Sequence, residues 1–248
     1  MKTRQADVSK VGSIQGINPG SYPAYVLGLN VHERSFKRGN TNTTAIVFEP
    51  VVLIAPQAEK ATNPQVKTDD RGFVLREEDS KKHIFATDEN GQVIEVNGAG
   101  IVGYTMYAKG MFCTLDPFRE PREEWKSYLN FLDICGIPYD EEEIAKGILP
   151  ELEKDDPLVI GAPVVAYLDQ DVYTTTEVNK ETNETKTVTK KKARVYDFFP
   201  WGNGQALSAE ALELLSEQLK AAQEAKESAS SNGEATPAES AAADGFSF

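Results

Sequence analysis

The sequence predicts a mainly β domain in which five strands and a helical segment form a small barrel, followed by a C-terminal helix and a polar tail. Five runs of alternating or β-branched apolar residues are separated by turn residues. A segment with apolar residues at three- and four-residue spacing lies between the third run and the fourth. The expected order is therefore strand, strand, strand, helix, strand, strand.

The first two strands are expected on either side of a basic loop. In SYPAYVLGLNVH, alternate residues from Tyr25 to Val31 share one side, as in a half-buried strand. The loop is ERSFKRGNTN, and the second strand is TTAIVFEPVVLIA. Pro50 interrupts this run, and because proline cannot donate to a strand ladder, we expect an edge or a bulge there.

Residues 56–98 are predicted to be an insertion, because hydrophobicity is lost there. Inside it, KHIFATDENGQVIEV is typical of a hairpin around Asn90 and Gly91, a pair that tolerates positive φ. The third strand follows in GIVGYTMYAKGMFC. Alternation places Tyr107 and Lys109 on one face of it and Met106 on the other.

The helical segment is expected to begin near Pro121, which suits a first helical turn, and to end at Gly136 and Pro138. A second short helix is expected after Asp140, whose position three residues before Glu143 is typical of a helix N-terminus. Trp125 and Phe131 in the first helix, and Trp201 where the domain ends, are assigned to packing.

The fourth strand lies in DPLVIGAPVVAYLDQDVYTTTEV and the fifth in TKTVTKKKARVYDFFPW, joined by NKETNE. After them, Leu212, Leu215 and Leu219 form one stripe of a helix that Ser208 is expected to cap. The stripe is expected to lie against the barrel or a neighbouring subunit, so a homo-oligomer stays open. The predicted organisation is an N-terminal arm (1–20), a domain (21–204) with the insertion, a helix (205–227) and a disordered acidic tail (228–248).

This element order is that of an OB-fold, whose ligand surface combines the second and third strands with the loops between strands one and two and between strands four and five. The net charge of −13 is distributed unevenly. Residues 205–248 carry −6 and residues 114–156 carry −8, which leaves +1 for the rest, with the basic residues in those same two connections. The acidity therefore does not exclude a polyanionic ligand.

Several classes of protein are disfavoured. Two cysteines without metal-ligand or disulfide spacing and a polar N-terminus indicate a reduced, cytoplasmic protein without a membrane segment. His32 and His83 occur singly and are expected to be structural. No GxGxxG, Walker, GxSxG or HExxH motif is present, so no enzyme activity, cofactor or metal is expected.

Basic and aromatic residues alternate in the two connections and on the third strand. A single strand of nucleic acid offers phosphates to cations and exposed base faces to aromatic rings, so this composition favours single-stranded nucleic acid as the ligand. An ordinary solvated strand face stays the alternative reading of the lysine run. The candidate residues are Arg34, Phe36, Lys37, Arg38, Tyr107, Lys109, Tyr173, Lys190, Lys191, Lys192, Arg194 and Tyr196.

The last residues, ADGFSF, place two aromatic rings at the end of an acidic segment. A mobile acidic segment is expected to compete with nucleic acid for the basic surface. Asp244, Phe246 and Phe248 are expected to anchor partner proteins.

The layout of the chain resembles that of single-stranded DNA-binding proteins of bacteria and bacteriophages. The stretches GSYPAYVLGLNVHERSFKRGNTNTTAIVFEPVV, YLNFLDICGIP and DDPLVIGAPVVAYLDQDVY are similar to phage proteins of that kind. The resemblance implies a protein that coats and protects single strands during phage DNA replication, recombination or repair, in the host cytoplasm, and recruits replication or recombination proteins through its tail. The alternative is a virion structural or assembly protein with a β-rich body.

Overall fold

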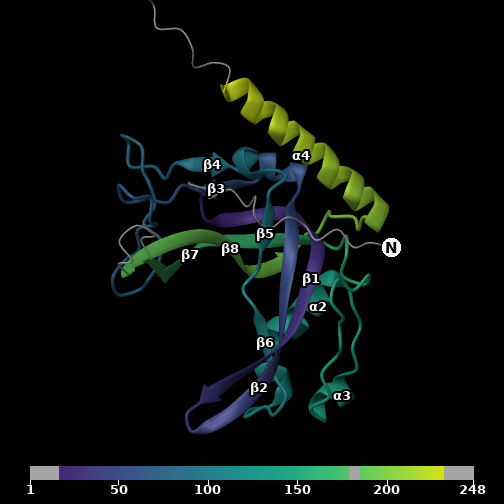
Figure 1. Cartoon of the computed structure of the whole chain (residues 1–248). Helices are drawn as coiled ribbons and strands as arrows, with labels where there is room; N and C mark the ends of the chain where they lie inside the picture. The colour runs from purple at the N-terminus through teal and green to yellow at the C-terminus, as the bar shows by residue number, and fades with distance from the viewer. Residues whose placement is uncertain (1–16, 179–184, 232–248) are drawn as a thin grey trace, which may run out of the picture.

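The computed structural model describes residues 17–178 and 185–231 (Figure 1). The strands are β1 (Gly20–Arg38), β2 (Thr41–Ile54), β3 (Thr62–Pro64), β4 (Glu95–Asn97), β5 (Thr105–Tyr107), β6 (Met111–Thr114), β7 (Pro163–Val178) and β8 (Thr185–Pro200). The helices are α1 (Pro121–Glu124), α2 (Lys126–Cys135), α3 (Glu141–Ala145) and α4 (Ala209–Ser231), with short 3-10 turns η2 (Pro56–Lys60) and η3 (Ala99–Ile101). The mainly β prediction with a C-terminal helix is confirmed.

One antiparallel sheet contains the main strands in the order β5-β2-β1-β7-β8, with β6 paired to β2 next to β5. The predicted closed barrel is wrong, because this sheet is open. Its two ends meet at a parallel bridge between Ala108 and Val195, where the Lys109 amide donates to the Val195 carbonyl at 2.8 Å. The third strand is divided into β5 and β6, and β5 is only three residues long, so it offers little backbone for a continuous ladder to β8.

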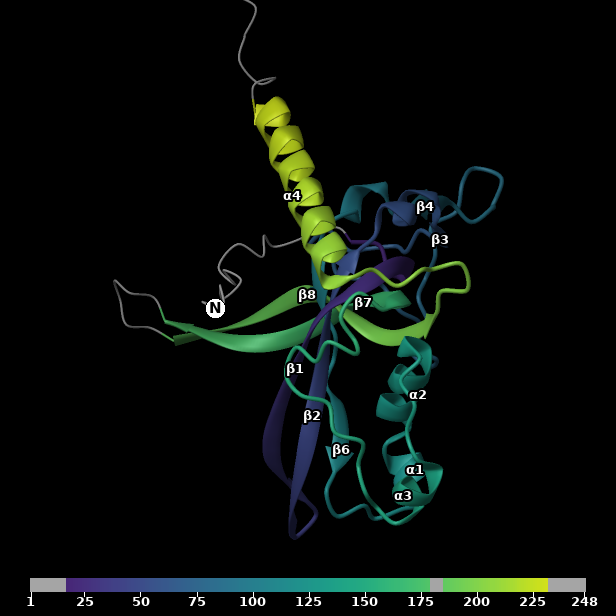
Figure 2. The ribbon, with the colours of Figure 1, turned by 90° about the vertical axis from the view of Figure 1, so that its right-hand side faces the viewer.

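The basic segment between β1 and β2 is part of a long hairpin, and its prediction as a loop is wrong. The two strands pair without a break from the Gly28–Val51 pair to the Arg38–Thr41 pair, and Gly39, with φ +63°, forms the turn. The hairpin extends away from β7 and β8, and β6, α1 and α3 lie alongside it (Figures 1 and 2). Both faces of its outer part carry polar residues, which is why the alternation of a half-buried strand is missing there.

Pro50 lies within β2, which pairs with strands on both sides and is not an edge. The Pro50 carbonyl accepts a hydrogen bond from the Ala108 amide at 2.9 Å. The Pro50 nitrogen, which carries no hydrogen, therefore also faces the third strand. β5 pairs with Val51 to Leu53 and β6 with Ala45 to Phe48. Proline is tolerated here because the ladder is interrupted between these two segments.

The insertion is a series of short pairings that leads back to β7. β3 pairs with β4, and isolated bridges continue the pairing outward. The expected turn at Asn90 and Gly91 is confirmed: Gly91 has φ +79° and donates to the Asp88 carbonyl at 3.1 Å. Asp169 of β7 fixes the insertion, since its carboxylate lies 2.6 Å from Arg76 Nη2 and 3.2 Å from His83 Nε2. His83 is thus structural, as predicted.

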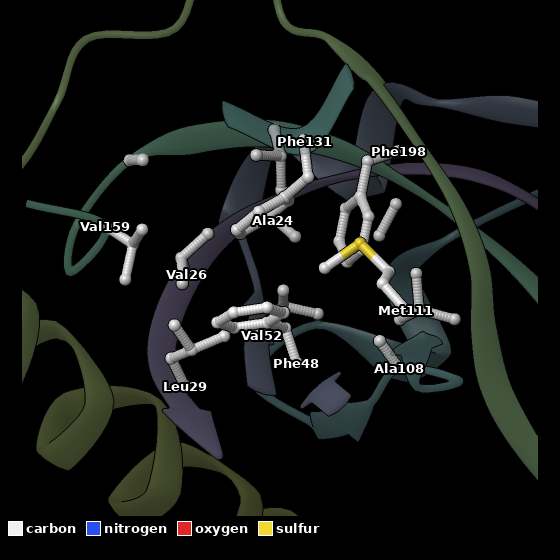
Figure 3. Packing of buried hydrophobic residues seen from close by; sticks show 14 of the residues in the cluster. Ala24, Val26, Leu29, Phe48, Val52, Ala108, Met111, Phe131, Val159 and Phe198 are labelled. Atoms are coloured by element: carbon white, nitrogen blue, oxygen red, sulfur yellow. The ribbon is translucent and has the colours of Figure 1, made fainter. Parts of the chain in front are cut away.

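The core lies between the sheet and α2 (Figure 3). Phe48 stacks on Tyr128 with ring centroids 4.0 Å apart, and Phe131 contacts Phe198 at 5.2 Å. The buried Trp125 indole donates to the Thr114 carbonyl at 3.1 Å. The packing roles predicted for Trp125 and Phe131 are confirmed.

Both predicted helix signals in this region are confirmed. α2 ends at Gly136, which has a left-handed φ of 71°. The Asp140 side chain accepts from the Glu142 amide at 2.7 Å at the start of α3. The acids of this segment therefore stabilise a helix terminus.

A second, smaller cluster fixes α4 to the sheet. Leu212 is buried with Tyr25 and Leu53, and Trp201 packs against Tyr25 at 5.3 Å between ring centroids. The predicted Ser208 cap accepts from the Ala211 amide at 3.2 Å. α4 continues beyond the expected end at residue 227, and its distal part projects away from the sheet (Figures 1 and 2). Within the described ranges, no helix has the length and apolar character needed to cross a lipid bilayer.

Candidate nucleic-acid interface

A pair of aromatic rings lies on the outer side of the β1–β2 hairpin. Phe36 of β1 and Phe112 of β6 meet edge to face, with centroids 6.2 Å apart and an interplanar angle of 88°. The Arg34 guanidinium lies 5.7 Å from the centre of the Phe112 ring. Phe112 remains 42% exposed, although neighbouring Cys113 points into the core and is completely buried. β6 therefore presents an accessible ring beside a cation of the hairpin.

Nearer the hairpin turn, Arg38 continues this arrangement. Its guanidinium lies 4.8 Å from the ring centre of the exposed Phe118, and its Nη1 donates to Glu124 Oε1 at 2.7 Å. Lys37 is exposed on the other side of the strand, since successive side chains alternate. Of the basic residues predicted in this segment, Arg34 and Arg38 lie on the same side of β1 as Phe36.

Where the two ends of the sheet meet, Lys109, Arg194, Tyr196 and Asp171 form a compact group. Lys109 Nζ lies 3.8 Å from the centre of the Tyr196 ring and 3.5 Å from Asp171 Oδ1. Arg194 Nε lies 3.4 Å from Asp171 Oδ2, and its Nη1 donates to the Ala108 carbonyl at 3.2 Å. Burial lowers the pKa of Lys109, but Tyr196 and Asp171 outweigh this effect and the net pKa is raised. Lys109 is therefore fixed as a cation.

Farther along the β7–β8 hairpin, cations and rings alternate again. Lys192 Nζ lies 4.9 Å from the centre of the Tyr173 ring, and Lys190 Nζ is 2.6 Å from Glu177 Oε1. Partial burial, and then the charge of Arg194, lower the pKa of Lys192. The hydrogen bond to Glu177 raises the pKa of Lys190. Lys192 thus lies in a partly buried site beside a second cation, Arg194.

The region around Gly110 connects these groups. A Cβ at Gly110 would lie 2.5 Å from Val47 Cγ1, 3.4 Å from Glu49 Oε1 and 3.4 Å from Phe112 Cε2, so Phe112 and Glu49 flank the residue that follows Lys109. Glu49 also acts electrostatically on Lys192. We call the connected surface the cation–aromatic face. It consists of Arg34, Phe36, Phe112, Lys109, Tyr196, Arg194, Lys192, Tyr173 and Lys190.

Lys191 does not belong to this face. Its Nζ lies 5.0 Å from the Phe73 ring centre and donates to the Arg71 carbonyl, so it contacts the insertion. Strand alternation separates it from Lys190 and Lys192. Tyr107 lies on β5 opposite Val51 and is partly exposed, two residues before Lys109 and on the same side of the strand.

The two hairpins leave the body in different directions in both views (Figures 1 and 2). Their outer ends therefore do not enclose a common groove. The cation–aromatic face instead bends at the group around Lys109 and Tyr196, with one arm along β1–β2 and the other along β7–β8.

Sequence reasoning missed Phe112 and Phe118. Continuous alternation from Tyr107 would place residue 112 on the core side, but Gly110 interrupts the strand between β5 and β6 and changes the phase. A glycine within a strand pattern is the signal that could have indicated this change.

Metal sites and reactive cysteines are both absent from the described residues. Among residues 17–178 and 185–231, no group of three or more His, Cys, Asp or Glu side chains is arranged to hold a metal ion. Burial raises the pKa of Cys135 to about 12 and also raises that of the free Cys113, so neither thiol is activated. Asp244, Phe246 and Phe248 lie outside the described residues.

Comparison of the chain with protein-family models, with curated proteins and with solved structures gives no match.

Proposed function

We propose that the protein binds single-stranded DNA along the cation–aromatic face, without catalysis. The observation that carries this proposal is that three rings each lie beside a cation: Phe112 beside Arg34, Tyr196 beside Lys109 and Tyr173 beside Lys192. Phosphates along a single strand pair with such cations, and unpaired bases stack on such rings whatever their sequence. An acidic chain with a net charge of −13 keeps this basic surface because the acids lie mainly elsewhere.

The strand connections support an OB-like fold for this function. The third-strand segments, β2, β1 and β7 occur in the spatial order 3-2-1-4, which is a Greek key, and β8 follows as the fifth strand. OB-folds are partly open Greek-key barrels whose ligand surface includes strands two and three and the two connections that here form the hairpins. The meeting of Ala108 and Val195 is compatible with such a partly open barrel.

The biological role that we propose is to coat and protect exposed single strands during phage DNA replication, recombination or repair. Binding a single strand in preference to a duplex favours strand separation by mass action. The C-terminal residues Asp244, Phe246 and Phe248 would recruit partner proteins. This part of the proposal depends on the sequence alone.

An electrophoretic mobility shift with oligo(dT) tests the proposal directly. We expect a shift with oligo(dT) that an excess of unlabelled duplex of equal length removes poorly, and we include an RNA competitor to determine sugar preference. Raising the salt concentration should weaken binding steeply, with a slope of log affinity against log salt of about −0.7 for each neutralised phosphate.

Absence of a shift at low salt would refute the proposal. In that case a virion assembly protein becomes the better candidate, because the insertion exposes the apolar side chains of Leu75, Phe85, Val93 and Ile94. Measurement of the mass of the protein in solution would then show whether copies of the chain assemble.

A further inference from the structure

We infer that Phe112, with Phe36 and Arg34, forms a stacking site for one unpaired nucleobase at the β1–β2 arm of the cation–aromatic face. This inference rests on the proposed function and adds a residue and a mode of recognition to it. It predicts that this arm detects whether bases are unpaired.

The geometry leaves the Phe112 ring available. A Phe side chain in a β-rich body is normally buried, yet this ring is 42% exposed while the next side chain, Cys113, is fully buried. Phe36 meets it at 88°, which fixes the pair without covering both rings by parallel stacking. Val47, opposite Phe112 in the strand pairing, is only 1% exposed and lies beside Phe112 on the same face of the sheet.

The neighbouring charges indicate the chemistry of the ligand. The Arg34 guanidinium lies 5.7 Å from the centre of the Phe112 ring, near the outer limit for a cation–π contact. Its interaction with this ring is therefore weak. A base on Phe112 would bring its own phosphate within reach of a cation of this kind. An apolar protein segment would use the rings but would gain nothing from Arg34. The combination therefore favours a nucleotide.

The same geometry explains how a duplex would be rejected. In a duplex both faces of each base are covered by the neighbouring base pairs, so stacking on Phe112 requires that the base first be unstacked, at a cost in free energy. In a flexible single strand this cost is small. Phe112 thus contributes to the difference in affinity between single strand and duplex, whereas cations attract both.

The test compares full-length Phe112→Ala with full-length Phe85→Ala. Phe85 is a matched control, because it is 40% exposed and also meets a neighbouring ring, that of His83, edge to face at 6.4 Å, but it lies on the insertion. The ligands are oligo(dT) and an abasic deoxyribose-phosphate chain of equal length at the same salt concentration. We expect Phe112→Ala to lose about tenfold in affinity for oligo(dT) and little for the abasic chain. Phe85→Ala should match the unmodified protein on both.

Two further variants separate stacking from folding. Phe112→Leu keeps an apolar side chain without a π-face and should lose most of the same affinity, whereas Phe112→Trp should keep it. The additional indole fluorescence of the Phe112→Trp variant should be quenched when oligo(dT) binds, and that of Phe85→Trp should not change. Thermal unfolding of each variant verifies that the fold is retained.

The possible failures are distinguishable. If the unmodified protein binds oligo(dT) and Phe112→Ala binds equally well, the stacking site is refuted and the proposed function stands. Equal losses on oligo(dT) and on the abasic chain would also refute stacking, because they would show that the ring only positions Arg34. If the unmodified protein binds neither ligand, the proposed function itself fails.

Discussion

Asp171 pairs with two cations of the proposed interface. Its two carboxylate oxygens lie 3.5 Å from Lys109 Nζ and 3.4 Å from Arg194 Nε, and Tyr196 Oη lies 3.4 Å from Oδ1. A phosphate that binds these two cations must compete with this carboxylate. Asp171 therefore holds the two cations in position in the free protein and lowers the affinity of the protein for its ligand.

We predict that Asp171→Asn tightens binding of oligo(dT) by roughly two- to fivefold at low salt, since partly exposed ion pairs are worth about 0.2–1 kcal/mol. Asparagine keeps the size of the side chain and removes its negative charge. Fluorescence anisotropy with labelled oligo(dT) measures the change.

Glu141→Gln is the control for Asp171→Asn, because Glu141 also pairs with an arginine, Arg122, but on the helical side of the molecule. It should leave the affinity unchanged. Weaker binding by Asp171→Asn would show instead that the carboxylate is needed to orient Lys109 and Arg194.

At the scale of single elements, the entry into β7 depends on a glycine. Gly161 has φ +80°, and a Cβ there would lie only 2.0 Å from the Leu207 carbonyl oxygen. The Leu207 amide in turn donates to the Gly161 carbonyl at 3.0 Å. This contact joins the start of β7 to the segment that leads into α4, so the backbones must approach closely.

We predict that Gly161→Ala destabilises the protein by about 3 kcal/mol or more, because backbone strain and a steric clash add together. Gly147→Ala is the matched control: its φ is +79°, but nothing lies within 4 Å of its Cβ position, so only the strain of about 1 kcal/mol applies. Urea unfolding curves of both variants measure the difference. Equal stabilities would show that the segment at Leu207 shifts at little cost.

The elements that sequence reasoning located correctly are those with local signals. Pro121, Gly136, Asp140 and Ser208 mark helix ends through hydrogen bonds and backbone angles made within a few residues. The outer part of the β1–β2 hairpin was missed because its pairing is satisfied within the hairpin and needs no apolar face. Phe112 was missed because the phase change at Gly110 arises where β5 and β6 meet β2, and alternation along one strand does not show it.

The connection between distant elements was partly predictable. The order of strands and the helix between the third and fourth indicated that two basic connections flank one surface, and Lys109, Arg194 and Tyr196 do meet there. The directions of the hairpins depend on twist and on contacts with the insertion. The spacing of apolar and basic residues predicts neither the twist nor these contacts.

At the scale of the whole molecule, the β7–β8 hairpin has two different surfaces. Lys190 and Lys192 lie on the cation–aromatic face, while Lys191 contacts Phe73 and the Arg71 carbonyl of the insertion. Gln170 on the same side accepts from the Val74 amide at 3.0 Å and donates to the Gly72 carbonyl at 3.1 Å. The insertion thus contacts the side of the hairpin that carries Lys191 and Gln170, and it is also held by Asp169, which pairs with Arg194 across the strands.

We predict that Lys192→Ala weakens oligo(dT) binding by about two- to fivefold and makes the salt slope shallower by about 0.7, the contribution of one phosphate. Lys191→Ala, the neighbouring variant with the same change in net charge, should change neither quantity, and should increase proteolysis within residues 65–76 because the insertion is held less firmly. A salt titration and limited proteolysis measure these effects. Equal losses of affinity in the two variants would mean that net charge, rather than the face, determines binding.

The single bridge between Ala108 and Val195 has a mechanical consequence for the whole molecule. Lys109 and Tyr196 follow these two residues directly, one on each side of the seam where the sheet nearly closes. A polymer that lies across both side chains ties the two margins together from outside. We expect a protein that binds a ligand in this way to open less readily along this bridge than the free protein.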